Sequence, residues 1–233
     1  RFPDATLFRS LSHGIRDQIG KRNAPGLFNL AWQKNLMWDG AVHHLEMQAL
    51  APLTDASEMD NTLLEVVNRL NNSHLYPPLT AAAFGSSTIT GEQVLEALAQ
   101  FQASLVSANA RYDKVKRGET TFSEQEARGY QVFQQHCNAC HTEPLFTNFS
   151  FENNGLPVDT TLNDWGRYAV TQLPEDSLKF KVPSLRNLRY TFPYMHDGRF
   201  ENLREVLRHY EKGMAFTASL SEQLREGVVI NDV

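Results

Sequence analysis

Two thiols and an imidazole stand close together in one short stretch of the chain. Cys137 and Cys140 are the only cysteines among the 233 residues, and His141 follows them directly in the segment CNACH. Thiols three positions apart on a helical turn can each bond one vinyl group of a porphyrin, and the adjacent imidazole can then bind the iron. The spacing C-x-x-C-H therefore predicts covalent attachment of a c-type haem.

Three other uses of two close cysteines are less well supported. A thioredoxin-like redox pair expects a βαβ context, and no such pattern surrounds Cys137. A zinc site needs four ligands, whereas the sequence has no second C-x-x-C and no paired histidines at ligand spacing. A disulfide between residues three apart would close a trivial loop. Because c haem is attached outside the cytoplasm, the motif also predicts a periplasmic protein.

The composition is that of an ordinary soluble globular protein. Apolar residues make up 41% of the chain and charged residues 21%, with a net charge of -5. No run of lysine or arginine appears, which argues against nucleic-acid binding. No apolar run approaches 18 residues, so no membrane span is expected. The first ten residues, RFPDATLFRS, lack the apolar core of a signal peptide, as a mature or trimmed chain also would.

Apolar stripes and capping boxes indicate a mostly α fold with long loops and little or no β-sheet. One apolar stripe predicts a helix within 61–72, and a capping box of Thr90 and Gln93 predicts a long helix over 90–112. A second box, Ser123 with Glu126, starts a helix that runs straight into Cys137. The remaining signals are a break in the pattern at YPPLTAAAFGSS, a polar link KRGETT, a helix after FPYMHDG that stops near Gly213, and a last helix from Ser219.

Several short segments occur in the order and separations of a known family. They are GKRNAPGLFN (20–29), MWDG (37–40), EMQALAP (46–52), EM (58–59), CNACH (137–141), FKVPSLRN (180–187) and TFPYMHDG (191–198). With this set the chain resembles the bacterial di-haem cytochrome c peroxidase family, including its MauG branch. The resemblance implies two cytochrome-c-like helical domains, each with one c haem, and a calcium ion between them. The expected domains are 1–115 and 116–233, the second carrying the CNACH haem site.

The chain departs from the family pattern at its start. The family has an earlier C-x-x-C-H before the GKRNAP segment, and it holds the haem at which peroxide is split. Residues 1–20 contain no cysteine. The expectation is therefore a chain that lacks the covalent site of the peroxidatic haem, with 1–115 as a remnant of that domain and the closing helix cut off after Val233.

The resemblance assigns the axial ligands of the remaining haem. Cys137, Cys140 and His141 would hold the electron-transfer haem. The peroxidase branch has a methionine fourteen residues after the histidine of PY-x-H, and the MauG branch has a tyrosine. Here that position is Tyr210, which also continues an apolar stripe and is explained as a core residue as well. Met195 and Met214 are the alternative ligands.

A peroxide pocket and an aromatic bridge are also implied by the resemblance. Trp38 corresponds to the tryptophan between the two haems. Glu58 would shuttle the proton that heterolysis of peroxide requires, Gln48 would orient peroxide, and Pro52 would keep the open face of the iron free. Without the resemblance, Glu58 reads as a surface acid and Trp38 as an ordinary buried side chain.

Calcium is implied at Asn23, Thr191 and Pro193, through one side-chain amide oxygen and two backbone carbonyls. Hard oxygen ligands completed by water make an acceptable shell for this ion. The sequence Asn-Ala-Pro is also typical of a turn, which explains Asn23 without calcium. His13 lies near the position of a removable distal ligand in some members, although its register differs by two residues.

The leading hypothesis is a periplasmic haem peroxidase that reduces hydrogen peroxide with electrons from a small donor such as a cytochrome c or cupredoxin. MauG-like oxidation of a protein is included in it, and the habits of the family imply a homodimer. The alternative from another class is a mono-haem electron carrier, which the single C-x-x-C-H supports and the peroxide-pocket residues oppose. A module with decayed catalytic equipment is a third option.

Overall fold

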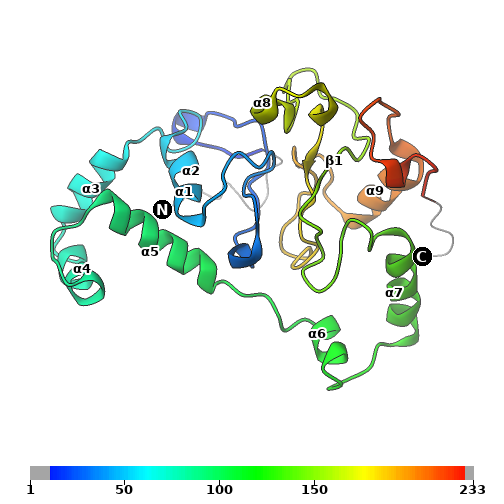
Figure 1. Cartoon of the computed structure of the whole chain (residues 1–233), viewed down its shortest axis with the longest axis horizontal. Helices are drawn as coiled ribbons and strands as arrows, with labels where there is room; N and C mark the ends of the chain where they lie inside the picture. The colour runs from blue at the N-terminus through cyan, green and yellow to red at the C-terminus, as the bar shows by residue number, and fades with distance from the viewer. Residues whose placement is uncertain (1–10, 229–233) are drawn as a thin grey trace.

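The structure, a computed structural model, describes residues 11–228, and it is mostly helical as the sequence predicted. Figure 1 shows one group of helices formed by the first half of the chain and another formed by the second half, with an extended segment between them. The α-helices of the first half are α1 (Leu45–Gln48), α2 (Leu50–Thr54), α3 (Leu63–Asn71), α4 (Tyr76–Phe84) and α5 (Gly91–Ser104). Those that follow are α6 (Arg111–Lys116), α7 (Glu124–His136), α8 (Tyr168–Thr171) and α9 (Leu203–Arg208).

Side-chain caps begin the helices that the sequence predicted best. At α5 the Thr90 hydroxyl accepts from the Gln93 N–H, and the Gln93 side chain accepts from the Thr90 N–H. Ser123 and Glu126 form the same reciprocal pair at α7. Each box satisfies backbone donors that have no partner within the helix. Both capping boxes are confirmed, and α7 ends at Cys137 as expected.

The helix predicted over 90–112 is shorter than expected. It ends at Ser104, and 105–110 is extended before α6 begins. The buried Asn29 explains the difference, because its side chain both donates to the Ser107 carbonyl (3.1 Å) and accepts from the Ser107 N–H (2.8 Å). Its own N–H donates to the Leu105 carbonyl. These long-range hydrogen bonds replace those of a continued helix.

A helix that the sequence did not predict spans the two prolines of YPPLTAAAF. It is α4, with Pro77 and Pro78 in its first turn. Proline is tolerated there because the first N–H groups of a helix have no intrahelical acceptor. The helix stops at Gly85, which adopts a left-handed conformation (φ 77°).

Two very short strands complete the second half of the chain. β1 (Phe151–Glu152) and β2 (Phe180–Lys181) pair antiparallel, with Phe151 opposite Lys181 and Glu152 opposite Phe180. Strand structure is therefore as sparse as the sequence predicted. This strand pair positions residues 180–181 beside the segment that follows Cys140.

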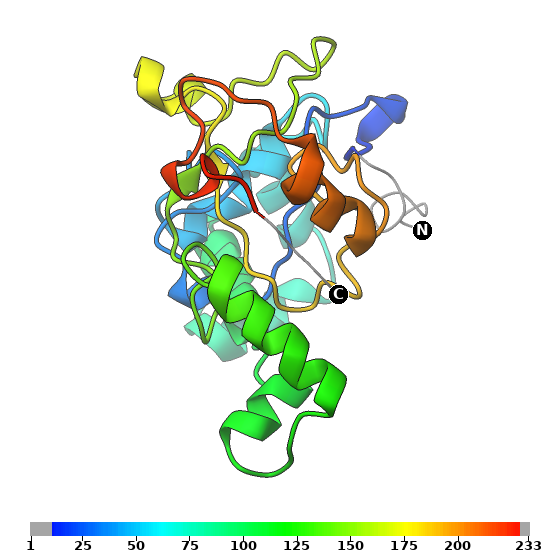
Figure 2. The same ribbon diagram turned by 90° about the vertical axis from the view of Figure 1, so that its right-hand side faces the viewer.

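The α6 segment is joined to the second half by a buried ion pair. The two terminal guanidinium nitrogens of Arg186 donate to the Asp113 carboxylate, at 2.9 and 2.7 Å. The Tyr112 ring also packs edge-on against Phe146 at 4.7 Å. In Figure 2, α7 and α9 lie together on the side facing the viewer, with α6 below α7. The predicted boundary between residues 115 and 116 stays a prediction.

No helix within residues 11–228 has both the length and the apolar character needed to cross a bilayer.

Candidate haem site

The end of α7 presents the two thiols and the imidazole in one tight turn. Backbone N–H groups of Cys140 and His141 both donate to the Cys137 carbonyl, at 3.2 and 2.8 Å. Neither cysteine forms a disulfide, and both are partly buried. Burial raises the pKa of each thiol. The motif is thus held as one compact unit with its sulfurs free to react.

The ring of His141 is oriented by two backbone carbonyls. Its Nδ1 lies 3.2 Å from the Phe146 oxygen and 3.1 Å from the Pro183 oxygen. An acceptor on that side favours the tautomer with the proton on Nδ1, which leaves the lone pair on Nε2. Burial also lowers the pKa of His141, so the imidazole is neutral near pH 7. A neutral, oriented imidazole is the form that binds a metal.

A cavity of about 270 Å³ opens beside this motif. Its volume is close to the lower end of the usual range of ligand pockets, about 300–1,000 Å³. Its walls are mostly apolar, and they include Leu203 and Leu207, which are exposed because they face this space. The predicted site residues in its lining are Cys137, Cys140, His141, Tyr210, Met195, Trp38, Gln48, Asn23, Thr191 and Pro193. The donor set, the free thiols and the apolar walls together fit a covalently bound haem.

Tyr210 lies in a π-helical turn, His209–Gly213, that continues α9. Such turns are rare and occur often at functional sites. Burial raises the pKa of Tyr210. Met195 also lines the cavity, but its sulfur accepts a hydrogen bond from the Asn154 amide at 3.4 Å. Met214 is not part of the lining, and the Asn154 side chain also bonds to Tyr210, so the cavity brings Tyr210 and Met195 to the site but not Met214.

Trp38 is fixed between the two halves of the chain. Its indole N–H donates to the Asn23 carbonyl (2.8 Å), and its own carbonyl accepts from the Lys181 N–H (2.7 Å). The ring meets His196 edge-on with centroids 6.5 Å apart, and His196 stacks on Phe180 at 3.7 Å. An aromatic cluster therefore lies along the cavity wall.

An ion-pair cluster beside these rings ties the loop of Trp38 to the second half. Arg22 donates to Asp39 at 2.6 Å and to both oxygens of Asp164 at 2.6 and 2.8 Å. Its guanidinium also lies over the Phe180 ring at 5.6 Å. Partly buried, bidentate pairs of this kind fix geometry more firmly than exposed ones.

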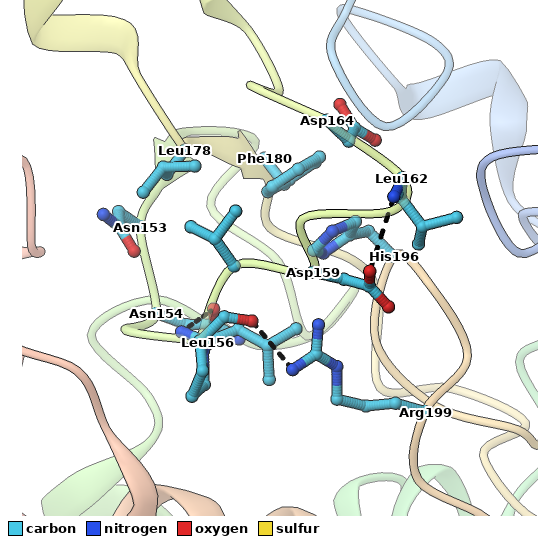
Figure 3. Close-up of a pocket in the computed structure, with 12 residues that line it drawn as sticks. Asn153, Asn154, Leu156, Asp159, Leu162, Asp164, Leu178, Phe180, His196 and Arg199 are labelled. Atoms are coloured by element: carbon cyan, nitrogen blue, oxygen red, sulfur yellow. Dashed lines mark hydrogen bonds between the residues drawn. The ribbon is translucent and has the colours of Figure 1, made fainter.

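A smaller cavity of about 20 Å³ lies on the other side of this cluster. Figure 3 shows His196 and Phe180 side by side at its wall, with Asp164 above them and Arg199 below. The volume is enough for about one water molecule. Burial lowers the pKa of His196 to about 4, so this ring is neutral near pH 7. The sequence identifies His196 only as the histidine of PY-x-H and does not predict its place in the cluster.

The four residues of the predicted peroxide pocket are only partly brought together. Trp38 and the buried Gln48, at the end of α1, line the large cavity. Pro52 lies in α2 and Glu58 in the turn after it, and neither lines that cavity. The Met59 N–H donates to the Pro52 carbonyl, which holds this turn against α2. Pro52 and Glu58 thus form a separate group in the first half of the chain.

Glu58 is partly buried, and burial raises the pKa of its carboxyl, with the charge of Asp55 as a second cause. The chain segment that carries His13 packs on it: the Ile15 N–H donates to the Glu58 carbonyl at 2.7 Å. A Cβ at Gly14 would collide with the Ser57 carbonyl oxygen, so glycine permits this close approach.

The residues of the predicted calcium site line one cavity in the structure. The Asn23 side-chain amide donates to the Pro193 carbonyl at 2.6 Å, and Thr191 lies on the same wall. A calcium ion here would require the amide to turn its oxygen toward the site. Between residues 11 and 228 no group of three or more acidic, histidine or cysteine side chains could hold a metal. A calcium ion here would depend on amide, carbonyl and water oxygens.

Comparison with known proteins agrees with this geometry. A family model described as di-haem cytochrome c peroxidase matches residues 2–121, just over half of the chain. The methylamine utilization protein MauG of Methylophilus methylotrophus is 40% identical over 212 residues, covering 88% of this chain and 62% of that protein. Cytochrome c551 peroxidase of Nitrosomonas europaea is 32% identical over 200 residues, which cover 84% of this chain and 60% of that protein.

Solved structures share the fold. A MauG-like protein associated with microbial copper homeostasis superposes with a TM-score of 0.83 at 28% identity, covering 96% of this chain and 75% of the other. The diheme peroxidase BthA of Burkholderia thailandensis gives a TM-score of 0.77 at 22% identity, which shows likeness of fold alone. The chain spans about six-tenths of the length of the curated relatives. By the family match and the site together, the chain belongs to the di-haem cytochrome c peroxidase family.

Proposed function

We propose that this chain is the greater part of a periplasmic c-type haem peroxidase, which reduces hydrogen peroxide with electrons from a small redox protein. The observation that carries the proposal is the single cavity lined by Cys137, Cys140, the oriented His141 and Tyr210. A c haem bound there supplies an iron that changes oxidation state by one electron. The two sulfurs would hold it covalently, and His141 Nε2 and the Tyr210 oxygen would bind its iron.

Trp38 is proposed as the aromatic connection between the halves of the chain. Its indole lies on the cavity wall, and its hydrogen bonds to Asn23 and Lys181 fix it there. An aromatic ring in this place divides electron transfer between the two halves of the chain into shorter tunnelling steps. The predicted domains, 1–115 and 116–233, are proposed as the two units that this residue connects.

Glu58, Gln48 and Pro52 are proposed as the peroxide-handling residues. A carboxyl group with a raised pKa can take a proton from one peroxide oxygen and return it to the other. Gln48 would orient peroxide by hydrogen bonding, and Pro52 would offer no side-chain ligand. Gln48 lines the His141 cavity, whereas Pro52 and Glu58 do not, which is consistent with a reaction centre that lies beside that cavity rather than in it.

Calcium at Asn23, Thr191 and Pro193 is proposed as a structural ion between the halves. The resemblance implies a tyrosine rather than a methionine at the position of Tyr210 in the MauG branch, so oxidation of a protein substrate belongs to the same proposal.

The test is a haem count on the full-length protein, matured in a host that attaches c haem, together with its reaction with peroxide. Two haems by pyridine haemochrome, and peroxide-dependent oxidation of a reduced small cytochrome or cupredoxin, are the expected results. One low-spin haem that is inert to peroxide would show a mono-haem electron carrier instead.

A further inference from the structure

One basic side chain from β2 lines the large cavity beside Cys137, Cys140 and His141. Lys181 is the one lysine or arginine in the cavity lining formed by residues 11–228. Its Nζ donates to the Gln33 side-chain oxygen at 2.7 Å, and Gln33 lines the same cavity. An ammonium and an amide therefore stand together on a wall that is otherwise mostly apolar.

Other basic side chains around the site are paired with carboxylates. Arg22 binds Asp164, Lys179 lies 3.4 Å from an oxygen of Asp176, and Arg186 binds Asp113. Lys181 forms no ion pair within residues 11–228, and its ammonium donates to a neutral amide instead. Lys181 thus differs from its neighbours in lacking an anion.

The carboxylate that belongs to the cavity wall is already engaged. Glu152 accepts hydrogen bonds from the hydroxyls of Ser150 and Ser221. In the strand register Glu152 lies opposite Phe180, whereas Phe151 lies opposite Lys181. The protein therefore supplies hydroxyl partners to its acid and leaves the ammonium without an acid of its own.

Burying an ammonium beside apolar groups without an anion costs desolvation free energy. A carboxylate that pairs with the ammonium offsets much of this cost. Burial accordingly lowers the pKa of Lys181 to about 8. A c haem carries two propionate carboxylates on the edge of the ring away from its thioether bonds. The cavity wall supplies the two thiols that would attach such a haem and the imidazole that would bind its iron.

We propose that Lys181, supported by Gln33, binds a propionate of the haem attached to Cys137 and Cys140. This inference rests on the proposed function only in requiring that haem. The backbone N–H of Lys181 also donates to the Trp38 carbonyl, so the residue that would hold the propionate is joined directly to Trp38. Lys181 is then a positioning residue that fixes the orientation of the haem and favours its reduced form through its positive charge.

The experiment compares the haem-loaded chain with Lys181→Gln, Lys181→Arg and the matched control Lys179→Gln. Haemochrome first establishes that each protein carries covalent haem. We expect Lys181→Gln to lower the midpoint potential and to shift the propionate bending band in the resonance Raman spectrum. Lys181→Arg keeps the charge and should restore both toward the wild type, and Lys179→Gln should leave both unchanged.

An unchanged potential and band in Lys181→Gln, or an equal shift in Lys179→Gln, would overturn the inference while the haem itself stands. Absence of covalent haem in the wild-type chain would overturn the proposed function as well. Should Lys181→Gln fail to mature, a crystal structure of the haem-loaded wild type decides the matter. A propionate oxygen about 2.7–3.2 Å from Nζ supports the assignment, and solvent or another side chain in that place contradicts it.

Discussion

At the residue scale, the environment of His141 prepares a neutral imidazole for a metal. Two carbonyls, from Phe146 and Pro183, face its Nδ1, and burial disfavours its protonated form. The sequence predicted the identity of this ligand from its spacing to the cysteines. It could not predict the orientation, because Pro183 is 42 residues away in the chain.

Tyr210→Phe tests the second axial ligand. Loss of an oxygen ligand should change the low-spin absorption of the bound haem and raise its midpoint potential, because an anionic oxygen favours the oxidised metal. Tyr194→Phe is the matched control, since Tyr194 lines the same cavity but its hydroxyl donates to the Leu188 carbonyl. A spectrum unchanged in Tyr210→Phe would exclude Tyr210 as a ligand.

Glu58→Gln tests the proton shuttle. An amide cannot take and return a proton, so peroxide reduction by the haem-loaded, full-length protein should slow by about 10²–10⁴-fold. The comparison is Glu46→Gln, an exposed acid of α1, which should retain the wild-type rate. Wild-type turnover in Glu58→Gln would remove this residue from the mechanism.

The raised pKa of Glu58 predicts the acid limb of the pH profile. The carboxylate must be deprotonated to accept a proton, so kcat/KM for peroxide should fall as the pH falls through this raised pKa. Asp55→Asn removes the nearby negative charge while retaining an oxygen that can accept from Ser57. The acid limb should then move to lower pH. The shift should be partial, because burial is the larger cause of the raised pKa. A limb that stays in place would contradict the assignment.

At the scale of elements, local signals predicted where helices begin better than where they end. The caps at α5 and α7 are built from residues three apart and can be read directly from the sequence. The end of α5 could not be read in this way, because Asn29, far earlier in the chain, holds 105–107 extended. The helix α4 was missed because its two prolines were interpreted as a break.

The ion pair that joins α6 to the second half should be a principal source of stability. Asp113→Asn leaves the Arg186 guanidinium buried without its anion, and we expect a loss of about 3–5 kcal/mol in the free energy of unfolding. Glu119→Gln breaks the exposed pair with Arg117 and should cost far less, because solvent screens an exposed ion pair. Urea unfolding of both variants checks this, and equal losses would contradict it.

At the scale of the whole molecule, contacts between distant segments assemble the site. Arg22 reaches Asp164, Asn23 reaches Pro193, and Trp38 accepts from the backbone of β2. Sequence motifs named several of these residues singly through resemblance to the family. The cluster of Trp38, His196 and Phe180, and the unpaired Lys181, could be recognised only when the chain was folded.

The covalent attachment of haem can be measured directly on the peptide that contains CNACH. The chain is matured in a host that exports protein and attaches c haem, digested with protease, and the fragment with Cys137 and Cys140 is weighed beside that from a Cys137→Ala, Cys140→Ala protein. We predict that the wild-type fragment carries the added mass of one haem and that the double variant carries none. A wild-type fragment at the mass of two unmodified cysteines would contradict the haem site and the peroxidase proposal that depends on it.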